Sequence, residues 1–286
     1  PMEKITKGIE MLVPELNDTV DGGHNAALAI MTTDTVPKEI AYEVEIGGKK
    51  CTIGGMCKGS GMIHPNMCTM LGFITTDINI SKELLTEALK EDIKDTFNMI
   101  SVDGDTSTND TVLLLANGLS GNDKITEKND DYYKFVEALH NVNVFLSKKI
   151  AGDGEGATAL FEVKIVNGSS KEQAVTLAKS VITSSLTKAA IYGHDANWGR
   201  ILCALGYSSA KINPDTVDIY FESKAGKLKI VENGMATDYS EEKATEILSE
   251  NYVTAICDMK MGEAEATAWG CDLTHEYVSI NADYRS

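Results

Sequence analysis

The sequence is poor in basic residues: 26 Lys and Arg stand against 43 Asp and Glu, which gives a formal net charge of -17. Proteins that bind nucleic acid gain much of their affinity from clustered Lys and Arg. No stretch of this chain carries such a cluster, so we expect no nucleic-acid partner.

Closely spaced metal ligands are also missing. The six cysteines, at positions 51, 57, 68, 203, 257 and 271, form no C-x-x-C pair, and the five histidines form no H-x-x-x-H pair. This spacing disfavours both a zinc site and a disulfide framework. We therefore expect no metal, no cofactor and a reducing compartment, namely the cytoplasm.

No apolar run reaches the length of a membrane span or a signal peptide. The first residues, "PMEKITKGIEML", carry charges every few positions. We expect no membrane partner, and because the chain opens on Pro1 we expect further residues upstream.

The 286 residues, 43% of them hydrophobic, are enough for one large domain or two smaller ones with cores of their own. Helical and strand-like periodicities alternate, which is typical of a mixed α/β protein. Helices are predicted over 82–97, 130–148, 170–190 and 240–250. Strands are predicted over 26–36, 40–46, 50–54, 112–117, 157–166, 216–221, 227–232, 252–258, 263–271 and 276–282.

Local signals support several of these elements. Gly47 and Gly48 predict a hairpin turn. Ser81 predicts the start of one helix, and Ser169 with Glu172 forms a capping box that predicts the start of another. No Pro-rich or Ser-rich linker marks a domain boundary.

Two segments resemble known binding motifs, one for dinucleotides and one for calcium, but neither matches its motif fully. "GDGEGA" at 152–157 fits the dinucleotide pattern G-x-G-x-x-A, but a helix precedes it and a strand follows, which reverses the required order. "DGDTSTND" at 103–110 has Thr108 where a calcium loop needs glycine. We expect neither nucleotide nor calcium binding.

The segment "HPNMCTMLGF" follows the glycine-rich stretch "IGGMCKGSGMI" and contains Cys68 next to Thr69. A threonine hydroxyl is a weak nucleophile, but its own α-amine, with a pKa near ~8, can act as its base once it is free. Attack of the Thr69 hydroxyl on the Cys68 carbonyl, followed by hydrolysis, would free that amine. The residues alone leave both this self-cleavage and an intact buried Cys-Thr pair open.

Six blocks of the sequence resemble the ArgJ family, the bifunctional ornithine acetyltransferases and N-acetylglutamate synthases of the cyclic arginine pathway. The resemblance runs from Pro1 to Ser286 with the blocks in family order. They are "MTTDTVPK" at 31–38, "GGMCKGSGMIHPNMCTML" at 54–71, "SVDGDTSTNDT" at 101–111, "GDGEGAT" at 152–158, "DANWGRI" at 195–201 and "INADYRS" at 280–286.

The resemblance implies a reaction. Autoproteolysis between Cys68 and Thr69 would give an α-chain, 1–68, and a β-chain, 69–286. Thr69 would then be the nucleophile that carries acetyl from N2-acetylornithine to glutamate. Some family members also accept acetyl-CoA, and members assemble as α2β2 heterotetramers.

The resemblance also implies substrate contacts. Lys58 would bind an amino-acid carboxylate, and Glu155 would bind the substrate's ammonium group. The remaining expected contacts besides Thr69 are Thr32 or its neighbour Thr33, Asn281 and Ser286.

Two departures from the family pattern bear on this site. Cys68 stands where the family usually has alanine. The family's oxyanion hole, a Thr-Gly pair in a "TGVIG" segment, precedes the position of Pro1, so the resemblance places it outside this sequence.

By resemblance the fold is a DmpA/ArgJ-like αββα sandwich with mixed sheets. We expect a main sandwich domain over roughly 1–165 and a smaller C-terminal α/β domain over 166–286. Two other functions remain open: a self-processing aminopeptidase or amidase of the same fold, in which water resolves the acyl-threonine, and a non-catalytic acidic binding protein in which Cys68-Thr69 stays intact.

Overall fold

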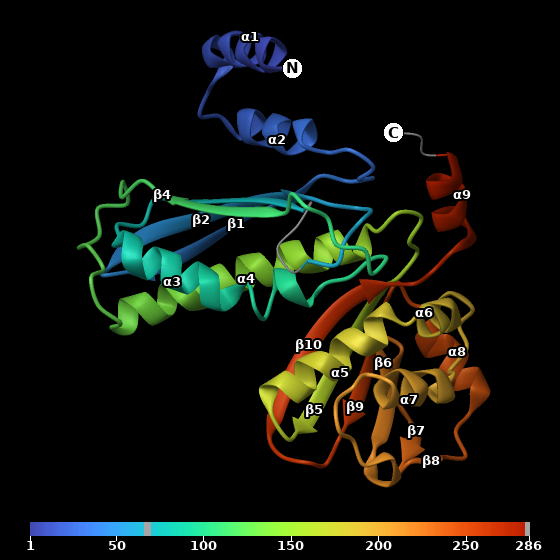
Figure 1. Ribbon diagram of the computed structural model, residues 1–286. Coiled ribbons are helices and arrows are strands. Elements are labelled where there is room, and N and C mark those ends of the chain that lie inside the picture. The colour runs from blue at the N-terminus through green and yellow to red at the C-terminus, as the bar shows by residue number, and fades with distance from the viewer. Residues whose placement is uncertain (66–69, 284–286) are drawn as a thin grey trace.

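The computed structural model describes residues 1–65 and 70–283, which form two mixed β-sheets covered by helices (Figure 1). The predicted fold class, α/β with mixed sheets, is confirmed. The predicted site residues Cys68, Thr69 and Ser286 lie outside the described residues.

The first sheet has the strand order β1-β2-β3-β4. Its strands are β1 (Lys38–Ile46), β2 (Lys49–Lys58), β3 (Leu71–Thr76) and β4 (Thr111–Ala116). β1, β2 and β3 pair antiparallel, whereas β3 and β4 pair parallel. The predicted hairpin turn joins β1 to β2, and Gly47 and Gly48 there have φ angles of 55° and 71°, which a residue without a Cβ adopts easily.

The two faces of this sheet differ (Figure 1). α3 (Lys82–Asp92) and α4 (Asp130–Gly152) cover one face, and α2 (Val20–Ala29) lies on the other. α4 packs closely on β2 because Gly55 has no side chain: a Cβ there would come within 2.9 Å of Leu146 on α4. The absence of a side chain at Gly55 therefore lets α4, the longest described helix, lie close to β2.

The second sheet has the order β10-β5-β9-β6-β7-β8. Its strands are β5 (Leu160–Gly168), β6 (Asp218–Ser223), β7 (Gly226–Glu232), β8 (Met235–Ala236), β9 (Tyr252–Asp258) and β10 (Ala264–Cys271). β5 and β9 are parallel and the other neighbours are antiparallel. Its helices are α5 (Lys171–Thr183), α6 (Ser185–Tyr192), α7 (Trp198–Gly206) and α8 (Glu241–Leu248). We propose that the C-terminal domain begins with β5, close to the boundary expected near residue 165, because β5 pairs with strands of this sheet.

α4 also contacts β5 and β10, so one helix touches both sheets. The buried Glu162 of β5 lies at this junction and accepts hydrogen bonds of 2.6 Å from Tyr252 and from Trp269. Lys148 of α4 lies 3.1 Å from the same carboxylate. Burial alone raises the pKa of Glu162, but the two aromatic donors and the nearby lysines outweigh it and hold that pKa below its usual value.

Two predicted strands are wrong. Residues 26–36 were expected to be a strand, but α2 occupies the first part of this range, because Thr19 caps it by accepting from the Gly22 amide at 3.0 Å. Residues 276–282 lie in the helix α9 (His275–Asp283), where the Thr274 hydroxyl accepts from the Tyr277 amide at 3.3 Å. In both cases a threonine before the helix supplies the cap.

Two helix boundaries also differ from prediction. The helix expected to continue to about residue 190 is broken at Ser184, whose extended backbone ends α5 and whose hydroxyl caps α6. The cap of α5 is Ser170, which accepts from Gln173, and not Ser169. The helix predicted over 82–97 ends at Asp92, and Ser81 caps it as expected.

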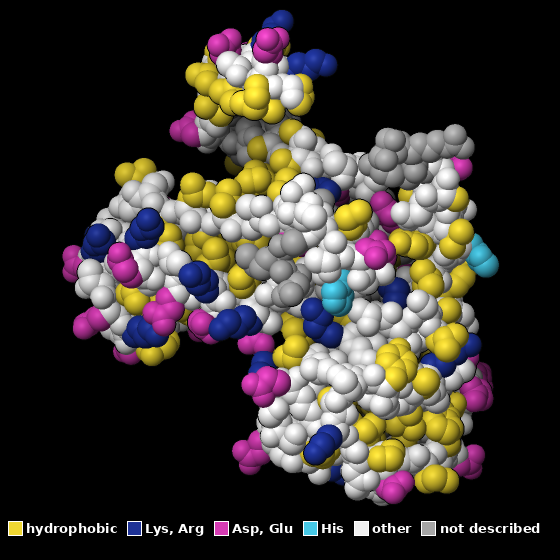
Figure 2. Space-filling view, in the orientation of Figure 1, with side chains coloured by type: hydrophobic (Ala, Val, Ile, Leu, Met, Phe, Trp, Pro, Cys, Tyr) yellow, Lys and Arg dark blue, Asp and Glu magenta, His cyan; other side chains and the backbone are white. Residues whose placement is uncertain are grey.

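The first helix, α1 (Met2–Leu12), has no buried residue. Figure 2 shows hydrophobic side chains along its side toward the first sheet. The exposed apolar residues of this helix include Met2, Ile5 and Ile9. Short 3-10 helices lie at η1 (Val13–Glu15), η2 (Phe97–Met99) and η3 (Pro214–Thr216). Within residues 1–65 and 70–283, no helix is both long and apolar enough to cross a membrane.

Candidate functional site

Three segments far apart in the sequence meet beyond the C-terminal end of β2. They are residues 31–37 after α2, residues 59–64 after β2 and residues 153–159 after α4. The Ser60 hydroxyl donates to the Asp153 carbonyl at 2.9 Å, and the Glu155 amide donates to the Ser60 carbonyl at 3.0 Å. The predicted contacts Lys58 and Glu155 are thus carried by segments that touch each other.

Lys58 is the last residue of β2 and pairs opposite Leu71 of β3. It is only 8% exposed, and no hydrogen bond or ion pair joins its ammonium group to another residue of the described part of the chain. Its Nζ atom is not among the fully buried polar atoms without a partner in the described residues, so the ammonium group reaches solvent although most of the residue is covered. Lys58 is therefore available to bind an anionic group of a ligand.

Glu155 is 9% exposed and accepts a 2.8 Å hydrogen bond from the side-chain amide of Asn281. Its carboxylate lies against Gly61, where a Cβ would come within 2.5 Å of the carboxylate atoms. The structure thus brings together Glu155 and Asn281, which the sequence separates by 126 positions.

Asn281 reaches this position because α9 is anchored near its start. The Thr274 hydroxyl donates to the Gly156 carbonyl at 2.8 Å, and the Tyr277 hydroxyl lies 3.4 Å from the Asp103 carboxylate. Burial, followed by the neighbouring Asp103, raises the pKa of Tyr277, so its hydroxyl keeps its proton.

Thr32 and Thr33 lie in the loop between α2 and β1. Thr32 is exposed and Thr33 is half-buried. The Thr32 amide donates to the Asp34 carboxylate at 3.1 Å. In the described residues no hydrogen bond joins either threonine to Glu155. A substrate that bound both would therefore have to bridge them.

The block at 101–111 contacts residues on both sides of the predicted cleavage site. Asp103 accepts from the amides of Met62 and Ile63 at 2.7 and 2.9 Å. Farther along the block, the Thr111 amide donates to the Met70 carbonyl at 2.8 Å. Sequence reasoning assigned this block to the family but gave it no structural role.

His64 lies next to the same block, with Nδ1 3.1 Å from the Ser101 hydroxyl. Burial lowers the pKa of His64, and the positive charge of Lys179 lowers it further. The imidazole is therefore neutral at pH 7.

Sequence reasoning missed a buried ion-pair group beside the site. Lys38 lies between the carboxylates of Asp34 and Asp153, at 2.6 and 2.5 Å. The only sequence signal was the spacing of four residues between Asp34 and Lys38, which says nothing of Asp153.

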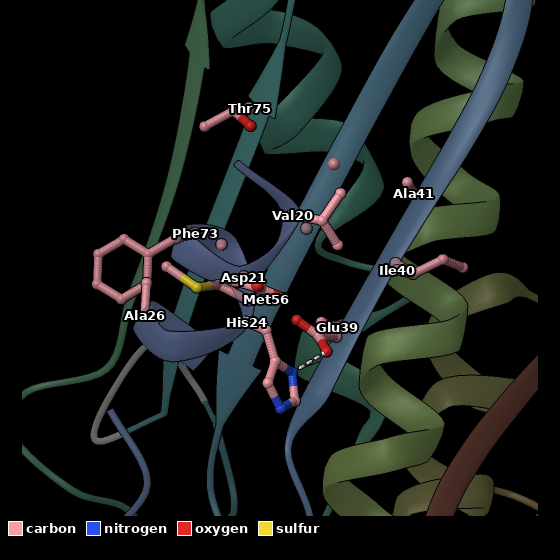
Figure 3. A pocket seen from close by; sticks show the side chains of 13 residues that line it. Val20, Asp21, His24, Ala26, Glu39, Ile40, Ala41, Met56, Phe73 and Thr75 are labelled. Carbon is pink, nitrogen blue, oxygen red and sulfur yellow. Dashed lines mark hydrogen bonds and ion pairs between the residues drawn. The ribbon is translucent and has the colours of Figure 1, made fainter. Parts of the chain in front are cut away.

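A cavity lies apart from these residues, between α2 and the face of the first sheet that α2 covers (Figure 3). It has a volume of about 610 Å³ and a mainly apolar lining that includes Ile40, Met56 and Phe73. Among its lining residues, His24 and Glu39 form a 2.6 Å pair whose side chains are a little under half exposed. None of the predicted site residues lines this cavity, so we do not assign it to the site.

Charged residues of both signs, brought by distant segments to one end of a mixed α/β fold, suit the binding of a small charged substrate. Comparison with known proteins gives the family. A model of the ArgJ family matches residues 1–286. The chain belongs to the ArgJ family, and the family expected from the six sequence blocks is confirmed.

Individual relatives agree. The chain is 52% identical over 287 residues to the arginine biosynthesis bifunctional protein ArgJ of Thermotoga neapolitana, with 100% of this chain and 71% of the relative covered. It is 54% identical over 286 residues to the arginine biosynthesis bifunctional protein ArgJ 1 of Clostridium acetobutylicum, with 100% and 70% covered. The prediction of an enzyme of arginine biosynthesis is confirmed by this membership.

A solved structure is also similar. The crystal structure of the arginine biosynthesis bifunctional protein ArgJ from Bacillus halodurans superposes with a TM-score of 0.72 at 44% sequence identity. The match covers 76% of this chain and 100% of the crystallised chain.

Proposed function

We propose that this protein is a glutamate N-acetyltransferase that moves an acetyl group from N2-acetylornithine to glutamate, with acetyl-CoA as a second donor to be tested. The nucleophile is Thr69, freed by self-cleavage between Cys68 and Thr69. Family membership supports the reaction class.

The observation that carries the proposal is the pairing of opposite charges at the site. The ammonium of Lys58, a residue that is 8% exposed, has no hydrogen-bond partner in the part of the chain that the structure describes, and it suits the carboxylate of an amino-acid substrate. The Glu155 carboxylate, held by Asn281, suits the side-chain ammonium of the acetyl donor. N-acetylornithine carries both groups. Thr32 or Thr33 and Ser286 complete the proposed substrate contacts.

The length of the crystallised relative supports the cleavage position. That chain is matched from end to end by 76% of this chain. The part of this chain from Thr69 onward makes up the same share of its 286 residues. A relative that had been cleaved at the equivalent bond would give a chain of this length.

Cleavage begins when the Thr69 hydroxyl attacks the carbonyl carbon of Cys68. The peptide C–N bond breaks and leaves an ester, and water hydrolyses that ester to release the Cys68 carboxylate and the Thr69 α-amine. Because both reacting groups belong to one chain, the step needs no second molecule except water.

In acetyl transfer, the free α-amine takes the proton of the Thr69 hydroxyl while the oxygen attacks the acetyl carbonyl. The amide C–N bond breaks, and ornithine leaves with that proton on its nitrogen. The α-amine of glutamate then attacks the acetyl ester, which gives N-acetylglutamate and restores the hydroxyl.

Intact mass and acetyl transfer test the proposal together. The wild-type protein should give two fragments that join at 68/69 and should form N-acetylglutamate from N-acetylornithine and glutamate. Thr69→Ala should give one mass near 30.9 kDa and no transfer. Acetyl transfer by Thr69→Ala would disprove the mechanism.

The same assay separates the other two functions. An aminopeptidase or amidase of this fold would release acetate or amino acids to water without needing glutamate. A non-catalytic binding protein would give the single mass of the uncleaved chain. Trapping the acetyl group and mapping it to Thr69 would exclude the binding protein, and transfer of that group to glutamate instead of water would exclude the amidase.

We further propose that the two fragments assemble as α2β2 and that the protein works in the cytoplasm. The five described cysteines are free thiols, which is typical of proteins from reducing compartments. Size-exclusion chromatography with light scattering measures the assembly.

A further inference from the structure

The group formed by Asp34, Lys38 and Asp153 is among the most completely buried sets of charges in the described residues. The side chains of Lys38 and Asp34 are 0% exposed and that of Asp153 is 10% exposed. The Lys38 ammonium lies 2.6 Å from Asp34 and 2.5 Å from Asp153, and 3.3 Å from the Val36 carbonyl. Two carboxylates around one ammonium leave an excess of one negative charge.

Backbone amides satisfy that excess charge. Asp34 accepts from the amide of Thr32 at 3.1 Å and from the amide of Gly59 at 2.8 Å. Burial alone raises the pKa of Asp34, but the bonds from Gly59 and Lys38 outweigh it and keep that pKa below its usual value. Asp34 is therefore ionised at neutral pH.

Asp153 makes the corresponding contacts on the other side of Lys38. It accepts from the Thr35 amide at 3.0 Å and also from the Thr35 hydroxyl. Its own backbone carbonyl accepts from the Ser60 hydroxyl at 2.9 Å.

Each segment that this group fixes carries a proposed substrate contact. Thr32 and Thr33 belong to the first segment, Lys58 directly precedes Gly59 in the second, and Glu155 follows Asp153 by two residues in the third. One ion-pair group thus fixes the three segments that carry these contacts, although in the described residues none of its members hydrogen-bonds to their side chains.

We infer that Asp34, Lys38 and Asp153 are positioning residues that align the substrate contacts of the three segments, an inference that rests on the proposed acetyl transfer. Their function is to hold the segments at fixed separations, so that a substrate meets a site already assembled. A purely stabilising ion-pair group would affect unfolding without a selective effect on substrate binding.

Asp153→Asn is the variant to test. It removes one charge, keeps the shape of the side chain and leaves Asp34 and Lys38 as a neutral pair. Substrate binding in the ground state should weaken more than the chemical step. The KM for N-acetylornithine should therefore rise about tenfold, while kcat stays within roughly threefold of the wild-type value.

Hydrogen exchange gives a readout that needs no activity. In Asp153→Asn, amide exchange should become faster in residues 31–37, where Thr35 bonds to Asp153. It should also become faster in residues 59–64, where the Gly59 amide bonds to Asp34. Exchange that changes only near Thr35, or a KM that stays at the wild-type value, would overturn the inference.

Asp218→Asn is the matched control. Asp218 is 4% exposed, accepts from the Asn233 amide at 2.8 Å and pairs with Lys260 at 2.7 Å, but it lies on β6 of the second sheet. The variant Asp218→Asn should lower the thermal unfolding temperature without changing the KM for N-acetylornithine. A rise in KM for this control as large as that for Asp153→Asn would show that lost stability alone explains the effect, and the inference would fail.

Thr35→Val is the milder variant if Asp153→Asn does not fold. Thr35 is exposed, and valine removes only the hydroxyl that donates to Asp153. KM should rise in Thr35→Val and return to the wild-type value in Thr35→Ser, and equal values in both would refute the role of this contact. If the wild-type protein transfers no acetyl group, the proposed function fails, whereas the exchange measurement still decides whether the group couples the segments.

Discussion

Replacing Gly61 by alanine should weaken substrate binding without unfolding the protein. A Cβ at this position would come within 2.5 Å of the Glu155 carboxylate, whereas ordinary contact begins at 3.4 Å. Because the obstacle is the end of a flexible side chain, Glu155 should move by about 0.9 Å and the backbone should stay in place. The φ angle of Gly61 is not in the left-handed region, so alanine brings no backbone strain.

That displacement is enough to break the hydrogen bond from Asn281, which is 2.8 Å long in the wild type. It also moves the carboxylate away from the proposed position of the donor's ammonium group. Losing one hydrogen bond to a charged group costs about 2 kcal/mol, which is roughly 30-fold in kcat/KM for N-acetylornithine.

Steady-state kinetics and thermal unfolding of the same preparations measure the two effects. Gly54→Ala, on the same strand as Lys58, is the matched control, because a Cβ there would lie at an ordinary 3.6 Å from Thr75. Wild-type kcat/KM in Gly61→Ala would refute the placement of Glu155 in the site. A large fall in the unfolding temperature would refute the argument that only a side chain moves.

Two further predictions concern stability. Glu162→Gln should lower the free energy of unfolding by about 2 kcal/mol in urea denaturation, because two nearby lysines lose their anionic partner in a buried network; an unchanged midpoint would contradict this. The hydrogen bond from His140 to Asp92, 2.6 Å long, raises the pKa of His140. Its stabilisation is therefore complete below the unfolded-state pKa and is lost as pH rises through the folded-state pKa. His140→Asn should accordingly cost more stability near about pH 6 than near about pH 9, and an equal cost at both would contradict the reasoning.

The sequence predicts the elements whose signals are local. Gly47 and Gly48 form the expected turn because both need positive φ. Ser81 caps its helix because its hydroxyl accepts from the Leu84 amide. The strand predicted over 26–36 is wrong because the hydrophobic residues of this run suit a buried strand as well as a helix. The capping residue Thr19, which favours the helix, lies seven residues before the run.

The site could be predicted only in part. Resemblance supplied Lys58, Glu155 and Asn281, and the structure adds that Glu155 and Asn281 bond directly. It could not supply the link between Lys38 and Asp153, because these residues are 115 positions apart and the link depends on how α4 packs on the first sheet. The resemblance gave Asn281 and Glu155 as separate substrate contacts although α9 was expected to be a strand, since the family pattern depends on residue identity and not on secondary structure; their roles stay a prediction.

The pairing of β2 with β3 has a practical consequence for the proposed cut. β2 precedes the Cys68-Thr69 bond and β3 follows it, and their register joins residues 53–58 to residues 71–76. Scission would therefore sever one covalent bond and leave the interstrand ladder in place. A nicked molecule should elute as a single particle under native conditions and separate into two bands only when boiled in detergent.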